Sequence, residues 1–204
     1  MADFFEALNS ELIAFIEKQV VFFTATAPEQ GRISLSPKGM DSLRCLNPKQ
    51  VAYLDLVGSG NETAAHINQN GRMTIMFCSF DKQPLILRLY GKGEVIQPSD
   101  SAWSGFSKHF PDYKGARQII LLNIESLQTS CGYGVPRMEF IAERPTLKKW
   151  CEGKTDEELQ QYQISKNARS IDGLETGLAL SKTSIRKSTV NNRSKKAKKG
   201  EGDE

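Results

Sequence analysis

Three short polar stretches of the chain could bind or transform a small molecule. The first, residues 34–39, reads SLSPKG and lies where a predicted strand ends. It brings two hydroxyls, one ammonium and a backbone that a ligand can approach. Turns use the same residue types. The stretch alone therefore leaves two interpretations open, an anion site and a turn with an exposed lysine.

The second stretch, residues 58–66, reads GSGNETAAH. Its glycines let a backbone come close to a ligand, and Ser59, Asn61 or Thr63 can cap the helix that follows. Free amides at a helix start, flanked by hydroxyls, form a phosphate site. Glu62 opposes this interpretation, because a carboxylate in the first helical turn already complements the helix dipole. A plain helix cap is the alternative.

The third stretch, residues 129–136, reads TSCGYGVP and places Cys131 in a glycine-rich loop after a long strand. It could hold a reactive thiol or form a tight corner. A nucleophilic thiol needs a partner base, and the chain has two histidines, His66 and His109. Their proximity to Cys131 does not follow from the sequence. We therefore name no catalytic residue, and no CxxC pair suggests a metal site.

The elements that position these stretches form mainly strands. Residues 3–18 show apolar spacing of a helix, whereas residues 20–27 and 32–36 predict a hairpin. Arg88 and Tyr90 alternate with leucines, so they share one face of their strand. Further strands are predicted at 51–57, 72–80, 85–96 and 117–128, and short helices at 62–70, 101–110 and 155–168. This pattern predicts a mainly β (α+β) fold, a closed or nearly closed antiparallel barrel of at least six strands with peripheral helices.

Composition places this barrel in one domain with a basic tail. The chain has 204 residues, 39% hydrophobic, and no apolar run that could cross a membrane. Its four cysteines are widely spaced, which favours a reduced, cytoplasmic protein. Residues 182–204 hold eight basic and three acidic groups, whereas residues 1–181 hold 19 and 21. We expect a domain over 1–176 and a disordered tail over 177–204, whose lysines could also serve nuclear import or a weak nucleic-acid contact.

The order SPKG, GSGNETAAH, GRMTIMFC, ILRLYGKG, QTSCGYGVP resembles the pyridoxamine 5'-phosphate oxidase-like family of FMN-binding split barrels. In particular, it is similar to a branch that carries SPKG, GSGNET and SCGYGVP. The match extends from about Phe22 to Leu174, since KNARSIDGL near its end is similar too. The resemblance implies a six-stranded split barrel, a homodimer, and FMN in a cleft at the dimer interface.

The resemblance also implies which residues bind ligands. The family's phosphate- and ribityl-binding strand corresponds to Arg32, Ser34, Ser36 and Lys38, and its helix start corresponds to Ser59, Gly60, Asn61 and Thr63. Its flavin-facing strand position corresponds to Arg88, and its loop beside the flavin corresponds to Cys131 and Gly132. Arg144 corresponds to the first residue of the oxidase's Arg-Leu-His substrate motif.

Two departures from the family pattern bear on function. Glu62 and Thr63 stand where the family has an Arg-Lys pair, so Arg32, Lys38 or Arg88 must supply the charge that FMN needs. After Arg144 the chain continues with proline and threonine, so oxidation of pyridoxamine 5'-phosphate is not expected. The sequence predicts an FMN-dependent oxidoreductase acting on an unknown small molecule. The alternative is a non-catalytic split-barrel module that has lost tight FMN binding.

Overall fold

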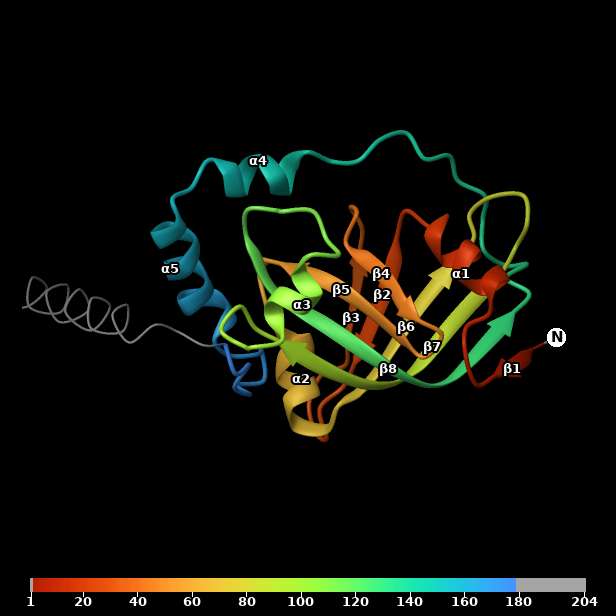
Figure 1. Cartoon of the computed structure of the whole chain (residues 1–204), viewed down its shortest axis with the longest axis horizontal. Coiled ribbons are helices and arrows are strands. Elements are labelled where there is room, and N and C mark those ends of the chain that lie inside the picture. The colour runs from red at the N-terminus through yellow and green to blue at the C-terminus, as the bar shows by residue number, and fades with distance from the viewer. Residues whose placement is uncertain (1, 179–204) are drawn as a thin grey trace, which may run out of the picture.

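The computed structural model describes residues 2–178, which form one curled antiparallel sheet with helices at its border (Figure 1). The strands pair in the order β3-β2-β6-β7-β8-β5-β4, and β1 pairs with β8. The strands are β1 Asp3–Phe5, β2 Phe22–Thr26, β3 Ser34–Lys38, β4 Leu43–Asn47, β5 Gln50–Leu56, β6 Arg72–Cys78, β7 Ile86–Ile96 and β8 Ala116–Ser130. The helices are α1 Ser10–Glu17, α2 Glu62–Asn70, α3 Trp103–Ser107, α4 Thr146–Glu152 and α5 Asp156–Asn167.

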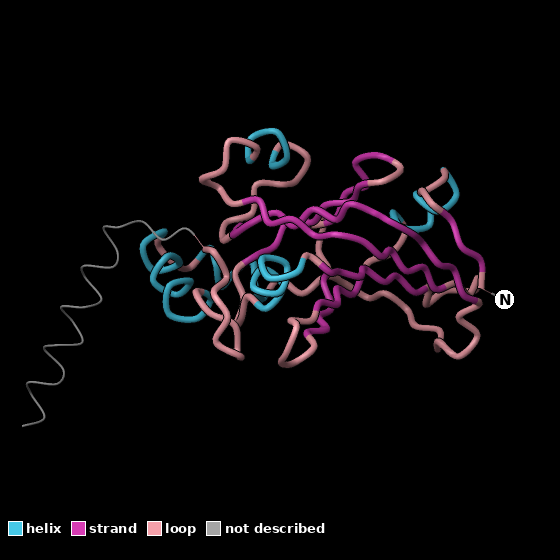
Figure 2. Tube along the Cα trace, turned by 90° about the horizontal axis from the view of Figure 1, so that it is seen from below, coloured by secondary structure: helices cyan, strands magenta, loops and turns pink. Residues whose placement is uncertain are grey.

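The count of six strands that the resemblance implies is too low, because the sheet has eight. All six predicted strands are present, and β2 and β3 form the predicted hairpin. The pairing path leaves β3 and β4 at opposite edges, so the sheet is a half-barrel. Seen from below, its strands curve around one side of the molecule (Figure 2).

The amino-terminal prediction of one helix over residues 3–18 is wrong in its first half. Residues 3–5 pair with residues 127–129 as strand β1. The helix begins only after Asn9, whose side chain accepts a hydrogen bond from the Leu12 amide at 2.8 Å. Phe4 and Phe5 therefore extend the sheet, since their aromatic side chains suit a strand as well as an amphipathic helix.

Both faces of the sheet bury apolar side chains. Alternation along β5 sends Val51 and Tyr53 into the core inside the curl, which α1 also covers. Ala52 and Leu54 point the other way, into a second cluster that Trp103 and its neighbours around α3 cover. Because both faces are covered, the fully buried residues of β5, Val51 to Asp55, are apolar apart from Asp55.

The curl of the sheet depends on a close approach at Gly91. The register of β7 and β8 shifts between Tyr90 and Gly91. A Cβ at Gly91 would lie 1.9 Å from the carbonyl oxygen of Asn123. Only glycine fits there without moving the neighbouring strand, so the glycine of the YGKG stretch permits this bulge.

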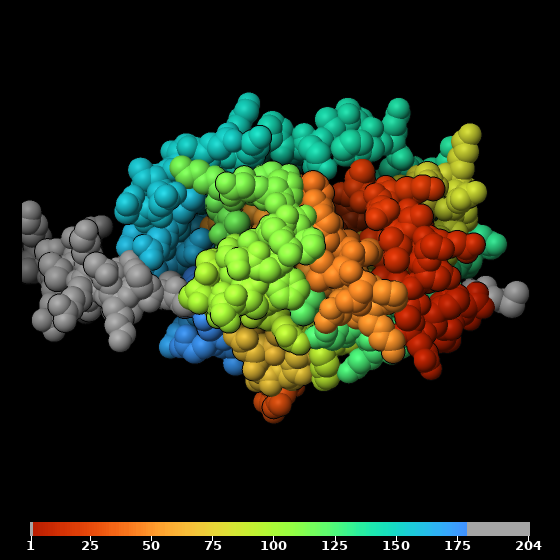
Figure 3. Space-filling view, in the orientation of Figure 1, coloured from red at the N-terminus to blue at the C-terminus, as the bar shows by residue number. Residues whose placement is uncertain are grey.

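The segment after β8 leaves the sheet and returns along the border of the molecule. Residues 131–145, here called the connection arm, lead to α4, and both form the upper border in the space-filling view (Figure 3). Helices α4 and α5 pack on the end of β5 through Val57, Cys151 and Leu159. Helix α5 confirms the prediction over 155–168 and starts at a capping box of Thr155 and Glu158, whereas α4 was not predicted.

Within residues 2–178, no helix combines the length and apolarity needed to cross a bilayer. The same residues contain no cluster of three or more His, Cys, Asp or Glu side chains that could hold a metal ion. The basic tail predicted from residue 177 lies, from residue 179 onward, outside the described residues. Gly177 itself accepts a hydrogen bond from the Gln97 side chain.

Candidate functional site

A pocket of about 620 Å³ lies where β3, the end of β5, the start of α2 and the segment after α5 meet. Strand alternation turns Ser34, Ser36 and Lys38 toward this pocket, while Leu35 points to solvent. The lining side chains are mostly hydroxyls, amides and charges: Ser34, Ser36, Lys38, Asp55, Ser59, Asn61, Glu62, Thr63, Arg117, Lys166, Arg169 and Ser170.

The inner wall of the pocket is a charged network centred on Asp55, which is 2% exposed. Its carboxylate accepts hydrogen bonds from Lys38 Nζ at 3.0 Å and from Arg117 Nη2 at 2.5 Å. Gln118 Nε2 donates to the same carboxylate at 2.8 Å. Two cations therefore share one buried anion, and the network keeps an excess of positive charge beside the pocket.

The pKa of Asp55 shows that this carboxylate stays ionised. Burial alone would raise its pKa, but the Lys38 ammonium and the Arg117 guanidinium outweigh burial through charge and hydrogen bonds. The net pKa lies well below the ordinary value. Asp55 is thus a structural anion that orients Lys38 and Arg117, and it cannot serve as a proton acceptor near neutral pH.

The start of α2 presents hydrogen-bond donors at the pocket. Asn61 occupies the cap position, but its side chain makes no capping bond. Its Oδ1 accepts instead from Gln118 Nε2 at 2.7 Å, and Arg117 Nη1 donates to the Gly60 carbonyl at 2.9 Å. The first amides of the helix are thus left without a side-chain cap. Asn61 is 2% exposed, and its Nδ2 has no partner in the structure.

These features fit an anionic group such as a phosphate. An uncapped helix start, a buried unpartnered amide donor, several hydroxyls and two cations converge on one pocket. Among the lining residues, Glu62 is the carboxylate outside the Asp55 network. It accepts hydrogen bonds from the Ile171 amide, at 3.0 Å to Oε2 and 3.2 Å to Oε1.

The structure brings together seven of the eleven residues that the resemblance assigned to a cofactor. They are Ser34, Ser36, Lys38, Ser59, Gly60, Asn61 and Thr63. Arg32 is close in sequence but its guanidinium pairs with Asp172, and it is not among the lining residues. Lys38 is the one predicted charge donor that lines the pocket.

The remaining predicted residues, Arg88, Cys131, Gly132 and Arg144, lie elsewhere. Arg88 Nη1 donates to Ser130 Oγ at 3.2 Å, at the last residue of β8, whereas Arg117 lies near its first residue. That separation is about 40 Å of extended strand. Cys131 and Arg144 are exposed at the two ends of the connection arm, and Gly132 adopts a left-handed φ of 66° near its start.

Neither histidine is shown to activate Cys131. His66 is 1% exposed, and its Nδ1 lies 3.0 Å from Thr26 Oγ1. It is therefore a core residue of α2. Between residues 2 and 178, no hydrogen bond joins Cys131 to a histidine. The interpretation of the third stretch as a corner is the one that the backbone supports.

Sequence reasoning missed Asp55, Arg117 and Gln118, which are all buried at the pocket wall. It assigned them to strands and gave them no role. A local signal existed, because YLDLV and ARQIILL each place polar groups inside an apolar run that is buried on both faces. Buried charges need partners, but the partners come from other strands, so the network itself was not readable from one segment.

Comparisons with known proteins agree with this architecture. Residues 8–131 match the model of a protein family described as pyridoxamine 5'-phosphate oxidase. The chain is 41% identical over 192 residues to the pyridoxamine 5'-phosphate oxidase family protein ustO of Aspergillus flavus, covering 85% of this chain and 77% of ustO.

Solved structures of HupZ from Group A Streptococcus are similar in fold. A variant of HupZ has a TM-score of 0.50 at 19% identity, covering 60% of this chain and 98% of HupZ. A second HupZ structure has a TM-score of 0.48 at 20% identity, covering 59% and 91%. Together with the family match over more than half of its length, the 41% identity shows that the chain belongs to the pyridoxamine 5'-phosphate oxidase family, with the split-barrel fold.

Proposed function

We propose that this protein binds FMN, with the phosphate in the pocket at the start of α2, and uses it as an oxidoreductase. The observation that carries the proposal is the convergence of unpartnered donors and cations there. Asn61 Nδ2 is buried without a partner, and the helix start has no side-chain cap. A phosphate would satisfy both, since its oxygens accept several hydrogen bonds.

The residues around this phosphate would have different roles according to their side chains. Lys38 and Arg117 supply positive charge, and Asp55 holds both side chains in place. Ser34, Ser36 and Thr63 line the pocket with hydroxyls that can bond to phosphate or to a polyol chain. Each residue binds or orients the ligand; none is positioned to act as an acid or base.

The bound flavin would supply the electron transfer, and the polypeptide would position it. The substrate is a small molecule other than pyridoxamine 5'-phosphate. Arg144 is exposed on the connection arm, outside the pocket, and the next two residues are proline and threonine. The chain therefore lacks the histidine with which the family's substrate motif ends.

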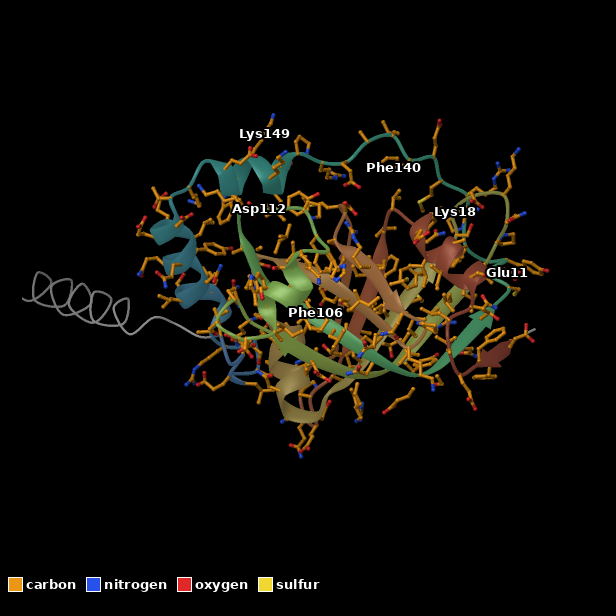
Figure 4. All side chains as sticks on the ribbon, viewed as in Figure 1. Glu11, Lys18, Phe106, Asp112, Phe140 and Lys149 are labelled. Carbon is orange, nitrogen blue, oxygen red and sulfur yellow. The ribbon has the colours of Figure 1, made fainter. Side chains whose placement is uncertain are left out.

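We further propose a homodimer with FMN at the interface, in which a second copy brings Arg88, Cys131 and Gly132 to the flavin. Apolar side chains without cover support such an interface. Ile33, just before β3, is 76% exposed, Leu35 within β3 is 64% exposed, and Ile141 on the connection arm is 92% exposed. Phe140, beside it, also lies on the arm at the border of the molecule (Figure 4). Light scattering after size exclusion should show a mass of two chains.

The decisive experiment compares FMN with riboflavin, which lacks the phosphate. The purified protein should be yellow or should quench the fluorescence of added FMN, and it should bind FMN at least about tenfold more tightly than riboflavin. A colourless protein that binds neither flavin would exclude the proposal.

Asp55 favours a second candidate, a non-catalytic module without tight FMN binding. Its carboxylate neutralises part of the charge of Lys38 and Arg117, two cations of the pocket. That candidate predicts equal, weak binding of FMN and riboflavin. The same titration therefore separates the two functions.

A further inference from the structure

The end of α5 and the segment that follows it close one side of the pocket, and we call residues 166–177 the strap, of which Lys166 and Asn167 are the last two residues of α5. Its own fold is fixed by backbone hydrogen bonds, in which the Ser170 amide donates to the Leu174 carbonyl at 2.8 Å and the Gly173 amide donates to the Ser170 carbonyl at 3.0 Å. On its surface, Arg169 forms an ion pair with Glu175. The strap lies beyond residue 131, where the match to the family model ends.

Polar contacts fasten the strap to the barrel at four places. Asn167 Nδ2 donates to the Gly58 carbonyl at 2.9 Å, just before the start of α2. The Ile171 amide donates to the Glu62 carboxylate, and Asp172 accepts from the backbone amide of Arg32 at 2.8 Å. At the far end, Asn68 of α2 donates to the Thr176 carbonyl at 2.9 Å.

This fastening places two more cations at the pocket. Lys166 and Arg169 line it together with Ser170 and Ile171, and none of these four residues belongs to the Asp55 network. Both cations are solvent-exposed. The ion pair of Arg169 with Glu175 joins two side chains that are each 67% exposed, so water screens it and Arg169 can exchange it for a ligand at little cost.

We propose that Lys166 and Arg169 bind the phosphate of the flavin, and that Glu62 is the positioning residue that holds the strap in place for them. This inference rests on the proposed function of the pocket. It accounts for the carboxylate at the helix start: Glu62 bonds to the strap amide and thereby brings two cations in place of the Arg-Lys pair that the family has there.

The pairing of the charged side chains around the pocket supports this role. Of the two lining carboxylates, Asp55 is held by Lys38, Arg117 and Gln118, and Glu62 is engaged by the Ile171 amide. Lys166 and Arg169 face the pocket without a lining carboxylate as partner. A dianionic phosphate would therefore meet both of them, while the barrel alone offers it only cations that already share an anion.

The test measures binding of FMN and riboflavin to the full-length protein by fluorescence titration, with inorganic phosphate as competitor. Lys166→Gln and Arg169→Gln should each weaken FMN binding about tenfold and leave riboflavin binding unchanged. Lys148→Gln is the matched control, because this exposed lysine of α4 removes the same charge outside the pocket. Equal FMN affinity in the Lys166→Gln, Arg169→Gln double variant and the control would overturn the proposal.

The direction in which Glu62→Ala changes FMN affinity shows whether Glu62 positions the strap or repels the phosphate. If Glu62 only repels phosphate, its removal tightens FMN binding; if it holds the strap, removal weakens FMN binding and speeds amide hydrogen exchange in residues 166–177. Glu62→Gln keeps an acceptor for the Ile171 amide and should fall between wild type and Glu62→Ala. Tighter FMN binding by Glu62→Ala would overturn the positioning role. Wild type that binds neither FMN nor inorganic phosphate would overturn the proposed function together with this inference.

Discussion

The pocket and the connection arm contrast in how many elements hold their polar groups. At the pocket, side-chain and backbone groups from β3, β5, α2, β8 and the strap bond to one another, and Asp55 alone has three donors. On the connection arm, Tyr133, Phe140 and Ile141 are largely exposed, and Met138 is tied to the sheet by a backbone bond to Phe80 at 2.9 Å. The pocket is therefore prepared for a ligand by the chain itself, whereas the arm offers surface.

The contrast also explains why the residues predicted to form one site lie in two separate regions of the chain. Arg117 and Ser130 lie at opposite ends of the 15-residue β8, so the groups near them cannot meet on one mononucleotide within one chain. Arg88 is hydrogen-bonded to Ser130 at one end of β8. Lys38 is hydrogen-bonded to Asp55, which also binds Arg117 at the other end. In the dimer that we propose, a second copy would bring the two groups of motif residues to one site.

The largest expected effect breaks the pocket network. Asp55→Asn leaves the buried Arg117 guanidinium without its anion, which should cost about 3–5 kcal/mol of unfolding free energy. Urea unfolding followed by circular dichroism measures this loss. The control is Asp41→Asn, whose carboxylate is 61% exposed and pairs with Arg44, and it should cost less than about 1 kcal/mol. Equal losses would show that the network does not stabilise the pocket.

The next prediction compares the loss of one cation at the pocket with the loss of one cation at the other end of β8. Lys38→Gln should weaken FMN binding by about 1.5–3 kcal/mol, because it removes a charge-assisted bond to the phosphate, and riboflavin binding should not change. Arg88→Gln lies outside the pocket and should not distinguish FMN from riboflavin. If Arg88→Gln weakened binding of FMN alone, the phosphate would lie at the other end of β8.

The pH dependence of stability should follow Asp55. Its pKa in the folded protein is lowered, so its contribution is present above the ordinary value of 3.8 and is lost as the pH falls toward the native pKa. The difference in unfolding free energy between wild type and Asp55→Asn should therefore be constant from about pH 5 to 7 and shrink below about pH 3.8. A difference that grew on acidification would contradict the ionised state of this carboxylate.

The smallest effect is expected on the connection arm. Ile141→Ser should change the unfolding free energy of the single chain by less than about 0.5 kcal/mol, because its side chain is 92% exposed. The measurement is made over a range of protein concentrations. A larger loss that depends on concentration would show that a second copy covers the arm, as the proposed dimer requires.

Much of the strand architecture could be predicted from local patterns. Apart from Ala25, Val20 to Thr26 is β-branched or aromatic, and the alternation of Ser34 and Ser36 with Leu35 indicates the second strand of a hairpin. Strand β4 was not predicted from the sequence, because LRCLN is short and mixes apolar with polar residues. Strand β1 escaped because Phe4 and Phe5 fit a helical pattern, and only the partner strand β8 decides between the two.

The sequence by itself determined the family, the predominance of strands and the residues at the start of α2, because these depend on local composition and motif order. Only the tertiary structure decided the electrostatics of the site. Asp55, Arg117 and Glu62 act through partners 62 and 109 residues away. A charge in a sequence has no fixed partner, so whether Glu62 repels a ligand or holds a strap depends on which segment the fold places beside it.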